Sequence, residues 1–474
     1  MSFYQHATLL PHRFRLILSS FLQHDELPFA DVLSVEQIHE AFGDAAAPLA
    51  EDEDTIYTEA ITLWAFLSQV LHKDEQRSCV AAVARVITLL VALGRKPCSE
   101  DTGAYCRARA RISEPVLRRL VCETADRCEA QIPKRWLWNG RHVKLVDGTT
   151  VSMPDTVKNQ AAYPQPPNQK KGLGFPVARM VVLFSLATAM VCGMAMGPYA
   201  GKQTGESALL RELLDLLDEG DILLADRYYC SYWMIAMLLA LDIDFVTRLH
   251  QLRTADFRRG RRLGKGDHTV RWMRPQKPQW MDQGTYEQMP KSIEVREVQV
   301  HVEQPGFRTE SLVVVTTLTD VNEYPQEDIA ELYHRRWLVE LDIRAMKCSL
   351  GMDVLRCKSP EMVRREIWVC LLAYNLIRRT MLQASKLSDL SPRQLSFAAA
   401  MQKIAACWIV LQLLDKETAT KLIDTHLAGL LAHRVGDRPD RFEPRAVKRR
   451  PKQQTLLTTP RNQIKAQMNF RSAT

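Results

Sequence analysis

The stretch YHRRWLVELDIRAMK, residues 333–347, governs how the rest of the chain is interpreted. At about 100° per residue in an α-helix, four polar side chains fall within an arc of roughly 60°: Tyr333, Arg336, Glu340 and Lys347. Three apolar side chains fall on the opposite side, where a core would hold them: Leu338, Leu341 and Ala345. One helix face therefore presents a carboxylate among a phenol, a guanidinium and an ammonium group.

A carboxylate in this setting suits a divalent metal ion, and the flanking cations suit phosphate groups. The same pattern also fits an ordinary solvated helix face with favourable ion pairs. The segment alone does not decide between these interpretations.

Two further acidic residues follow strand-like runs upstream: Asp147 in HVKLVDGTT (142–150) and Asp226 in GDILLADRYY (220–229). Taken singly, Asp147 before Gly148 is also compatible with a turn, and Asp226 before Arg227 with an ion pair at a strand end. Taken together, two carboxylates on strand ends and a third on a later helix form a set of hard oxygen ligands.

This arrangement resembles the DDE transposases and retroviral integrases. The Tyr–Arg–Glu–Lys spacing resembles, more specifically, the insertion-sequence-four family of bacterial transposases. The resemblance runs over most of the chain and includes four further segments: LGKGDHTV (263–270), ELYHRRW (331–337), EIWVCLLAYNLIR (366–378) and RQLSF (393–397).

The resemblance implies catalysis by two Mg²⁺ ions about 3.5–4 Å apart, which Mn²⁺ is expected to be able to replace. Asp147 would bridge the two ions, Asp226 would bind one ion and Glu340 the other. Carboxylates suit this task because Mg²⁺ prefers hard oxygen ligands.

The resemblance also implies which side chains contact DNA. Arg336 and Lys347 would hold phosphates of the transposon end, and Tyr333 would hydrogen-bond or stack close to the cleaved bond. Arg248 occupies a place where relatives keep a basic DNA contact. Arg227 is compatible with either a phosphate contact or an internal salt bridge.

The order of strand-like and helix-like segments predicts an α/β fold. Three antiparallel strands, a helix, a parallel strand, a helix and a strand are the order of the ribonuclease-H-like fold, which the resemblance also implies. The segments after the strand of Asp147 are a hairpin at 176–199, a helix at 205–220, a strand at 221–226, a helix at 232–241 and a strand at 244–250. Asp147 and Asp226 should then lie side by side at the centre of the sheet.

We predict three regions: an all-helical DNA-binding region at 1–135, a catalytic domain at 136–385 and a helical C-terminal region with a basic tail at 386–474. The N-terminal helices are expected at 14–22, 34–42, 55–71 and 79–93, and after Ser113 as N-cap. This region also contains five arginines, which would either contact DNA phosphates or simply be solvated: Arg107, Arg109, Arg111, Arg118 and Arg119. The tail from Arg434 is either solvated or in contact with DNA or a second subunit.

A β-rich insertion is expected at about 251–325, between the second and third acids. In better-known relatives this insertion holds a Trp that stacks on a flipped base. Here the corresponding position is Leu312, which leaves Trp272 or Trp280 as candidates. Trp337 is expected to pack rather than to recognise a base.

Composition agrees with a cytoplasmic protein that binds a polyanion. The 474 residues carry a formal charge of +8, and the isoelectric point is near 8.9, which suits nucleic acid. Eleven Cys without a CxxC pair predict reduced thiols. No signal peptide is recognisable, and the longest apolar run, 79–93, is too short for a membrane span and should be a buried helix.

The preferred hypothesis is a cut-and-paste transposase associated with the bacterial nucleoid. Its partners would be double-stranded DNA, namely terminal inverted repeats and target DNA, and a second copy of the chain in a homodimer. The resemblance also implies a hairpin intermediate at the transposon end. Two alternatives remain: a DNA-binding relic that no longer cuts, and a metal-dependent nuclease without strand transfer.

Overall fold

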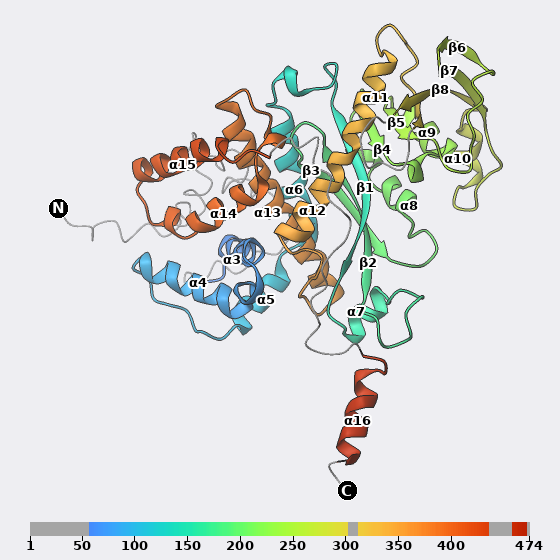
Figure 1. The fold of residues 1–474 in the computed structure, drawn as a ribbon. Helices are drawn as coiled ribbons and strands as arrows, with labels where there is room; N and C mark the ends of the chain where they lie inside the picture. Colours follow the sequence, from blue (N-terminus) through green and yellow to red (C-terminus); the bar gives the residue numbers. More distant parts are fainter. Residues whose placement is uncertain (1–55, 302–310, 436–456, 472–474) are drawn as a thin grey trace.

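The computed structural model describes residues 56–301, 311–435 and 457–471 (Figure 1). The helices predicted at 14–22 and 34–42, and the tail arginines from Arg438 to Arg450, lie outside these residues. Within the described part, a central β-sheet is flanked by helices that come from both ends of the chain (Figure 1).

A single nine-stranded mixed sheet has the order β3-β2-β1-β4-β5-β9-β8-β7-β6. Its strands are β1 Val143–Ser152, β2 Val177–Ser185, β3 Val191–Pro198, β4 Ile222–Ala225, β5 Asp244–Arg248, β6 Arg261–Gly264, β7 Asp267–Met273, β8 Ser292–His301 and β9 Ser311–Thr316. β2 pairs antiparallel with β1, and β3 pairs antiparallel with β2. On the other side, β4 pairs parallel with β1, and β5 pairs parallel with β4. The predicted mixed α/β architecture is confirmed.

The strands predicted in the insertion do form, but they do not build a separate sheet. β9 pairs antiparallel with β5 on one side and with β8 on the other. β6 to β9 therefore continue the central sheet beyond β5. This pairing supplies the edge of β5 with partners for its backbone hydrogen bonds.

The central strands are apolar on both faces because helices cover both faces. Val143 and Leu145 of β1 face a core shared with α13 (Pro360–Lys386), and Val146 faces a core shared with α8 (Glu206–Arg211) and α9 (Tyr232–Leu239). Alternation along β1 thus places Asp147 on the α13 side of the sheet.

The N-terminal helices share the core of the sheet. Their bounds are α3 Glu59–Leu71, α4 Cys79–Ala92, α5 Gly103–Arg111 and α6 Glu114–Glu129. Ser113 is the N-cap of α6 and a proline stands in its first turn, as predicted. α4, predicted to be a buried helix, is buried along one face only, and Val80 and Val91 are exposed.

The helix predicted at 205–220 is shorter than expected. α8 ends at Arg211, and a separate 3₁₀ turn follows at Leu214–Leu216. Leu216 fills the space above Gly193 of β3, where a Cβ atom would lie 2.2 Å from its Cδ1 atom. Tertiary packing onto the strand overrides the helical propensity of this leucine-rich segment.

The remaining helices are α7 Val157–Ala162, α10 Gln283–Gln288, α11 Gln326–His334, α12 Leu338–Arg344, α14 Phe397–Cys407, α15 Lys416–Leu431 and α16 Arg461–Arg471. α13 begins after Ser359 and is buried over most of its length, as predicted. A search of the described residues finds no helix with the length and apolarity that a membrane span requires.

Candidate active site

Asp147 and Asp226 come together because of strand register. β1 and β4 are parallel neighbours with Val146 opposite Ala225, so the next residue of each chain segment is an aspartate. Asp147 accepts a hydrogen bond from the Gly148 N–H group at 2.7 Å. Asp226 accepts one from the Arg227 N–H group, also at 2.7 Å. The predicted side-by-side placement of the two carboxylates is what the structure shows.

The segment 333–347 carries the third acid, but it is not one regular α-helix. α11 passes through a 3₁₀ turn at Arg335–Trp337 into α12, which ends in a π-helical turn at Ala345–Ser349. From residue 332 to 347, the fully buried apolar residues are Leu332, Val339 and Met346. The predicted core positions Leu338, Leu341 and Ala345 are only half-buried, because the irregular turns rotate the helix surface away from ideal 100° spacing.

Arg336 stands between the acidic residues. Its Nη2 group donates to Glu340 Oε1 at 2.9 Å, one helical turn away. Interaction with Tyr333, Glu340 and Asp226 outweighs the desolvation of the guanidinium group and raises the pKa of Arg336. The same cation also favours the charged form of Asp147. The guanidinium group thus links α12 electrostatically to both strand-end aspartates.

The pKa of the Asp147 carboxyl lies well above its usual value. Burial raises its pKa to about 6, and the neighbouring carboxylates Glu206 and Asp226 add to this effect. The Gly148 N–H group and Arg336 act in the opposite direction. A buried carboxylate whose charge is this costly is typical of a site built to receive positive charge.

Tyr333 and Arg248 lie close to Asp226. Tyr333 is 8% exposed, and burial raises its pKa to about 12, an effect that Asp226 increases and that Arg336 and Arg248 oppose. Arg248 is the last residue of β5 and is half-buried. The structure therefore brings both predicted residues to the site, with the Tyr333 ring enclosed rather than presented for stacking.

Lys347 reaches the strand of the first acid. Its ammonium group donates to the Thr150 carbonyl oxygen at 2.8 Å and to Thr149 Oγ1 at 3.3 Å. Lys347 therefore lies along β1, on the far side of Asp147 from the end of β4. Arg227 follows Asp226 directly and has an exposed side chain; no ion pair of Arg227 is present in the described part of the chain.

The residues present fit a divalent metal ion in donor chemistry. Asp147 and Asp226 supply adjacent hard oxygens, and Glu340 is directed to Arg336 on the same side of the sheet. As placed, no three His, Cys, Asp or Glu side chains among the described residues are grouped closely enough to hold a metal ion together. Glu340 would have to turn from Arg336 to complete the set.

Glu206 is a fourth carboxylate that sequence reasoning missed. It is the first residue of α8, and its side chain covers Gly148, where an added Cβ atom would lie 2.3 Å from the Glu206 Cδ atom. Burial raises the pKa of Glu206. The Asp226 carboxylate adds to this rise, and the Arg179 guanidinium group opposes it. Only the tertiary contact at Gly148 reveals this residue, because α8 has no sequence signature of a site.

The tryptophans behave differently from the predictions. Trp272 is 6% exposed, donates to Glu297 at 3.3 Å and lies under Arg253, and Trp280 lies under Arg211. The Trp272 ring is therefore not free to stack on a base, whereas Trp280 is half-buried with Arg211 over its ring. Trp337, for which packing was predicted, is 44% exposed.

Tyr228 is an aromatic residue at the site that the sequence analysis did not single out. It lies two residues after Asp226 and is 53% exposed. Its ring meets that of the buried Tyr229 edge-on at 5.9 Å. An exposed phenol ring beside the acidic residues is available for a base or sugar.

Comparison with known proteins agrees with this geometry. Residues 138–376, about half of the chain, match the family described as "Transposase DDE domain". The transposase InsG for insertion sequence element IS4 of Escherichia coli (strain K12) is 28% identical over 357 residues, which are 73% of this chain and 76% of InsG. This chain belongs to the DDE transposases, in the insertion-sequence-four family.

Two other matches are weaker, because one covers a short stretch of the chain and the other has low sequence identity. The transposase for insertion sequence element IS421 of Escherichia coli is 38% identical over 65 residues, 14% of this chain and 18% of that protein. The structure of the piggyBac transposase synaptic complex with hairpin DNA covers 87% of this chain and 84% of its own chain at 12% identity. Its TM-score of 0.41 does not establish a shared fold.

Membership of the family fixes the broad activity. This DDE transposase is an enzyme of DNA cleavage and strand transfer, and DNA is its substrate. The family also implies catalysis by a divalent metal ion.

Proposed function

We propose that this transposase moves its element by cutting and pasting. It binds the terminal inverted repeats, cleaves each transposon end through a hairpin intermediate, and transfers the free 3′ ends into target DNA. The observation that carries the proposal is the register of β1 and β4, which sets Asp147 beside Asp226 below the Arg336–Glu340 pair. DNA strand cleavage requires such a cluster of hard oxygens next to cations that hold phosphate.

Asp147, Asp226 and Glu340 would hold two Mg²⁺ ions, or Mn²⁺ in their place. When bound, the ions supply charge stabilisation for the phosphoryl transfer. Arg336 would hold a phosphate of the transposon end once Glu340 turns away from it. Lys347, whose ammonium group contacts β1, would hold a second phosphate, and Tyr333 would contribute a hydroxyl group beside Asp226.

The catalytic unit is proposed to be a ribonuclease-H-like domain. The order β3-β2-β1-β4-β5, with β4 and β5 parallel to β1, supports this assignment. We place its limits at 136–385, with the insertion at about 251–325, after a DNA-binding region at 1–135 and before the C-terminal region at 386–474. The common core of α3, α6, α13 and the sheet means that these units are packed together.

DNA contacts outside the acidic cluster are proposed from exposure. Arg227 is exposed beside Asp226, and Arg248 ends β5 beside Tyr333. Of the N-terminal arginines, three are exposed and suited to phosphates: Arg107, Arg111 and Arg118. The other two have internal partners, because Arg109 donates to Gln69 and Arg119 to Glu123.

The active form is proposed to be a homodimer on paired transposon ends in the bacterial cytoplasm, at the nucleoid. Coordinated joining of two ends at one target requires two active sites held in a fixed geometry. Truncating the tail or altering the insertion should therefore impair end pairing before it impairs chemistry. Normal end pairing by such variants would count against this assembly.

Cleavage of a labelled duplex that carries the element's own end tests the proposal. We compare the unmodified protein, Glu340→Gln and the control Glu331→Gln, in Mg²⁺ and in Mn²⁺. Glu331 is a matched control because it forms an ion pair with Arg335, four residues away. Glu340 forms an ion pair with Arg336 at the same spacing. We expect a nick at the transposon boundary that is lost in Glu340→Gln, kept in Glu331→Gln, and accompanied by unchanged DNA binding.

Each other outcome identifies an alternative. Binding without a nick by the unmodified protein in either metal indicates a DNA-binding relic. Cutting without joining to a target indicates a nuclease of the same family. Cutting that persists in Glu340→Gln means that another residue is the third acid.

A further inference from the structure

Asp342 is a buried carboxylate on the helix that carries Glu340. It lies two residues after Glu340 on α12 and therefore points roughly 200° around the helix from it. Asp342 is 1% exposed, so it contacts neither solvent nor DNA. A buried charge of this kind persists only where opposite charges and hydrogen bonds compensate its desolvation.

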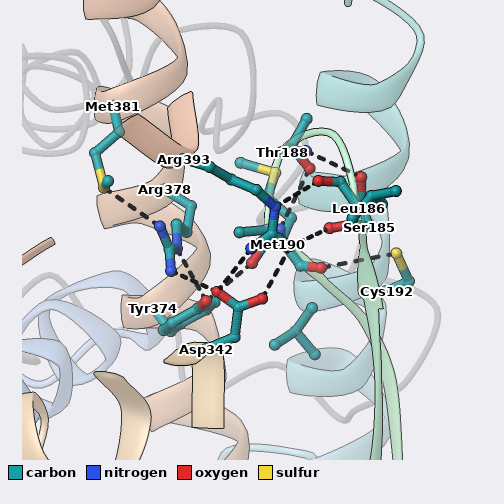
Figure 2. A network of polar contacts seen from close by, with 12 residues as sticks. Ser185, Leu186, Thr188, Met190, Cys192, Asp342, Tyr374, Arg378, Met381 and Arg393 are labelled. Carbon is teal, nitrogen blue, oxygen red and sulfur yellow. Dashed lines mark hydrogen bonds and ion pairs between the residues drawn. The ribbon is translucent and has the colours of Figure 1, made fainter. Parts of the chain in front are cut away.

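Two arginines hold this carboxylate, as Figure 2 shows. Arg378 of α13 donates from Nη2 to Asp342 Oδ1 at 2.7 Å. Arg393, in the 3₁₀ turn Pro392–Gln394, donates from Nη2 to Oδ2 at 2.9 Å and from Nη1 to Oδ1 at 3.3 Å. Both oxygens of the Asp342 carboxylate thus accept hydrogen bonds from charged donors, two at Oδ1 and one at Oδ2.

Both arginines continue to the turn between β2 and β3. Arg393 donates to the carbonyl oxygens of Ser185, at 2.9 Å, and of Leu186. Arg378 donates from Nε to the Tyr374 hydroxyl group at 2.9 Å, and that hydroxyl group donates to the Ala189 carbonyl oxygen, also at 2.9 Å. Two separate routes therefore connect Asp342 to one turn (Figure 2).

That turn joins β2 to β3, and β2 pairs with β1, the strand that contains Asp147. β2 pairs with β1 so that Lys144 is opposite Ser185 and Asp147 is opposite Val182. The chain of contacts from Asp342 thus ends on the strand pair that holds Asp147. It crosses from α12 through α13 and the 392–394 turn, so it also includes a residue of the C-terminal region.

We propose that Asp342, Arg378 and Arg393 form a positioning network that fixes the Glu340 carboxylate relative to Asp147, so that both can hold metal ions in one site. The inference rests on the proposed function, because it assigns a task to Glu340. None of the three residues touches DNA or metal in this scheme; they act through the backbone of α12. Supporting side chains of this kind hold metal ligands within about 0.5 Å of a productive geometry.

The alternative is that the network only stabilises the fold. A second buried ion pair in the chain permits this distinction: Arg296 donates to both Asp267 oxygens, at 2.8 and 2.6 Å, with 0% and 2% of the two side chains exposed. This pair ties β7 and β8 to the carbonyl oxygens of Leu318 and Tyr324, far along the sheet from α12. It matches the Asp342 network in burial and geometry but holds no proposed metal ligand.

The experiment compares Asp342→Asn and Arg393→Lys with Asp267→Asn and the unmodified protein. Mn²⁺ affinity is measured by electron paramagnetic resonance on the full chain, with and without duplex. The Mg²⁺ concentration for half-maximal cleavage, DNA binding and the unfolding midpoint are measured alongside. Arg393→Lys keeps the charge but loses the two-pronged contact, so it remains informative if Asp342→Asn does not fold.

We expect Mn²⁺ affinity to fall about 10–100-fold in Asp342→Asn, and by a smaller factor in Arg393→Lys. Asp267→Asn should lower the unfolding midpoint comparably while its Mn²⁺ affinity stays within about twofold of the unmodified protein. Equal Mn²⁺ affinity in all four proteins, or an equal loss in Asp267→Asn, would overturn the inference. If the unmodified protein binds Mn²⁺ but does not cut its own end, the proposed function fails while the affinity comparison still decides the positioning role.

Discussion

Replacing Asp147 by Asn should stabilise the metal-free protein at neutral pH. Burial and neighbouring carboxylates raise the pKa of the Asp147 carboxyl from 3.8 to about 6. Because the pKa is raised on folding, the contribution of this group to stability is complete below pH 3.8 and is lost as the pH rises through about 6. At about 1.36 kcal/mol per pH unit, the charged form costs about 3 kcal/mol above pH 6.

Asn removes that cost because it carries no charge at any pH. We expect the free energy of unfolding of Asp147→Asn, in the presence of a chelator, to exceed that of the unmodified protein by up to about 3 kcal/mol at pH 7.5. The difference should shrink towards zero near pH 4, where the aspartate is itself mostly protonated in the folded protein. A urea unfolding series from pH 4 to 8, followed by tryptophan fluorescence, measures this difference.

Two comparisons make the result specific. Asp215→Asn changes an exposed aspartate and should leave stability nearly unaffected across the same pH range. Mg²⁺ should stabilise the unmodified protein at pH 7.5 but not Asp147→Asn, because a ligand that binds only the folded state adds to its stability. A difference that does not vary with pH, or a destabilised Asp147→Asn at pH 7.5, would refute the electrostatic reasoning.

Three further predictions concern the walls of the site. Lys347→Ala should weaken duplex binding and lower the salt dependence of the binding constant by about one ion, whereas Lys347→Arg should retain both, as measured by fluorescence anisotropy over a salt series. Glu206→Gln should move the rising limb of the cleavage rate to lower pH, because Glu206 raises the pKa of Asp147; an unmoved limb would exclude this coupling. Tyr228→Ala should weaken binding of an unpaired transposon end by about 1–3 kcal/mol, and Tyr228→Phe should bind normally if stacking is the cause.

The sequence predicted the meeting of Asp147 and Asp226 because each strand is recognisable from its local pattern and the order of elements makes the two strands neighbours. Each aspartate follows a run of apolar residues that is long enough for a buried strand, and parallel neighbours place their ends at the same edge. The same reasoning gave the hairpin of β2 and β3 and the strands of the insertion. β2 and β3 are buried over most of their length, whereas the strands of the insertion are partly exposed and follow from their alternating pattern.

The sequence did not predict which face of 333–347 is buried. The assignment assumed one ideal helix with the core opposite Glu340, whereas the structure buries Val339, Asp342 and Met346. An aspartate at a core position is unexpected from hydrophobic pattern alone. It becomes acceptable only through Arg378 and Arg393, which lie 36 and 51 residues further along the chain. Nothing local to α12 encodes those partners.

The Tyr–Arg–Glu–Lys spacing of residues 333–347 remained recognisable although the segment contains two irregular turns. The 3₁₀ turn at Arg335–Trp337 and the π turn at Ala345–Ser349 depart from ideal spacing in opposite senses, the first tighter and the second wider than an α-helix. Arg336 still reaches Glu340, and Lys347 still reaches β1, because long flexible side chains absorb the angular error. Val339 and Met346 cannot do this, since a packed core tolerates little displacement. The spacing of long charged residues therefore predicts their contacts here more faithfully than the apolar spacing predicts the core.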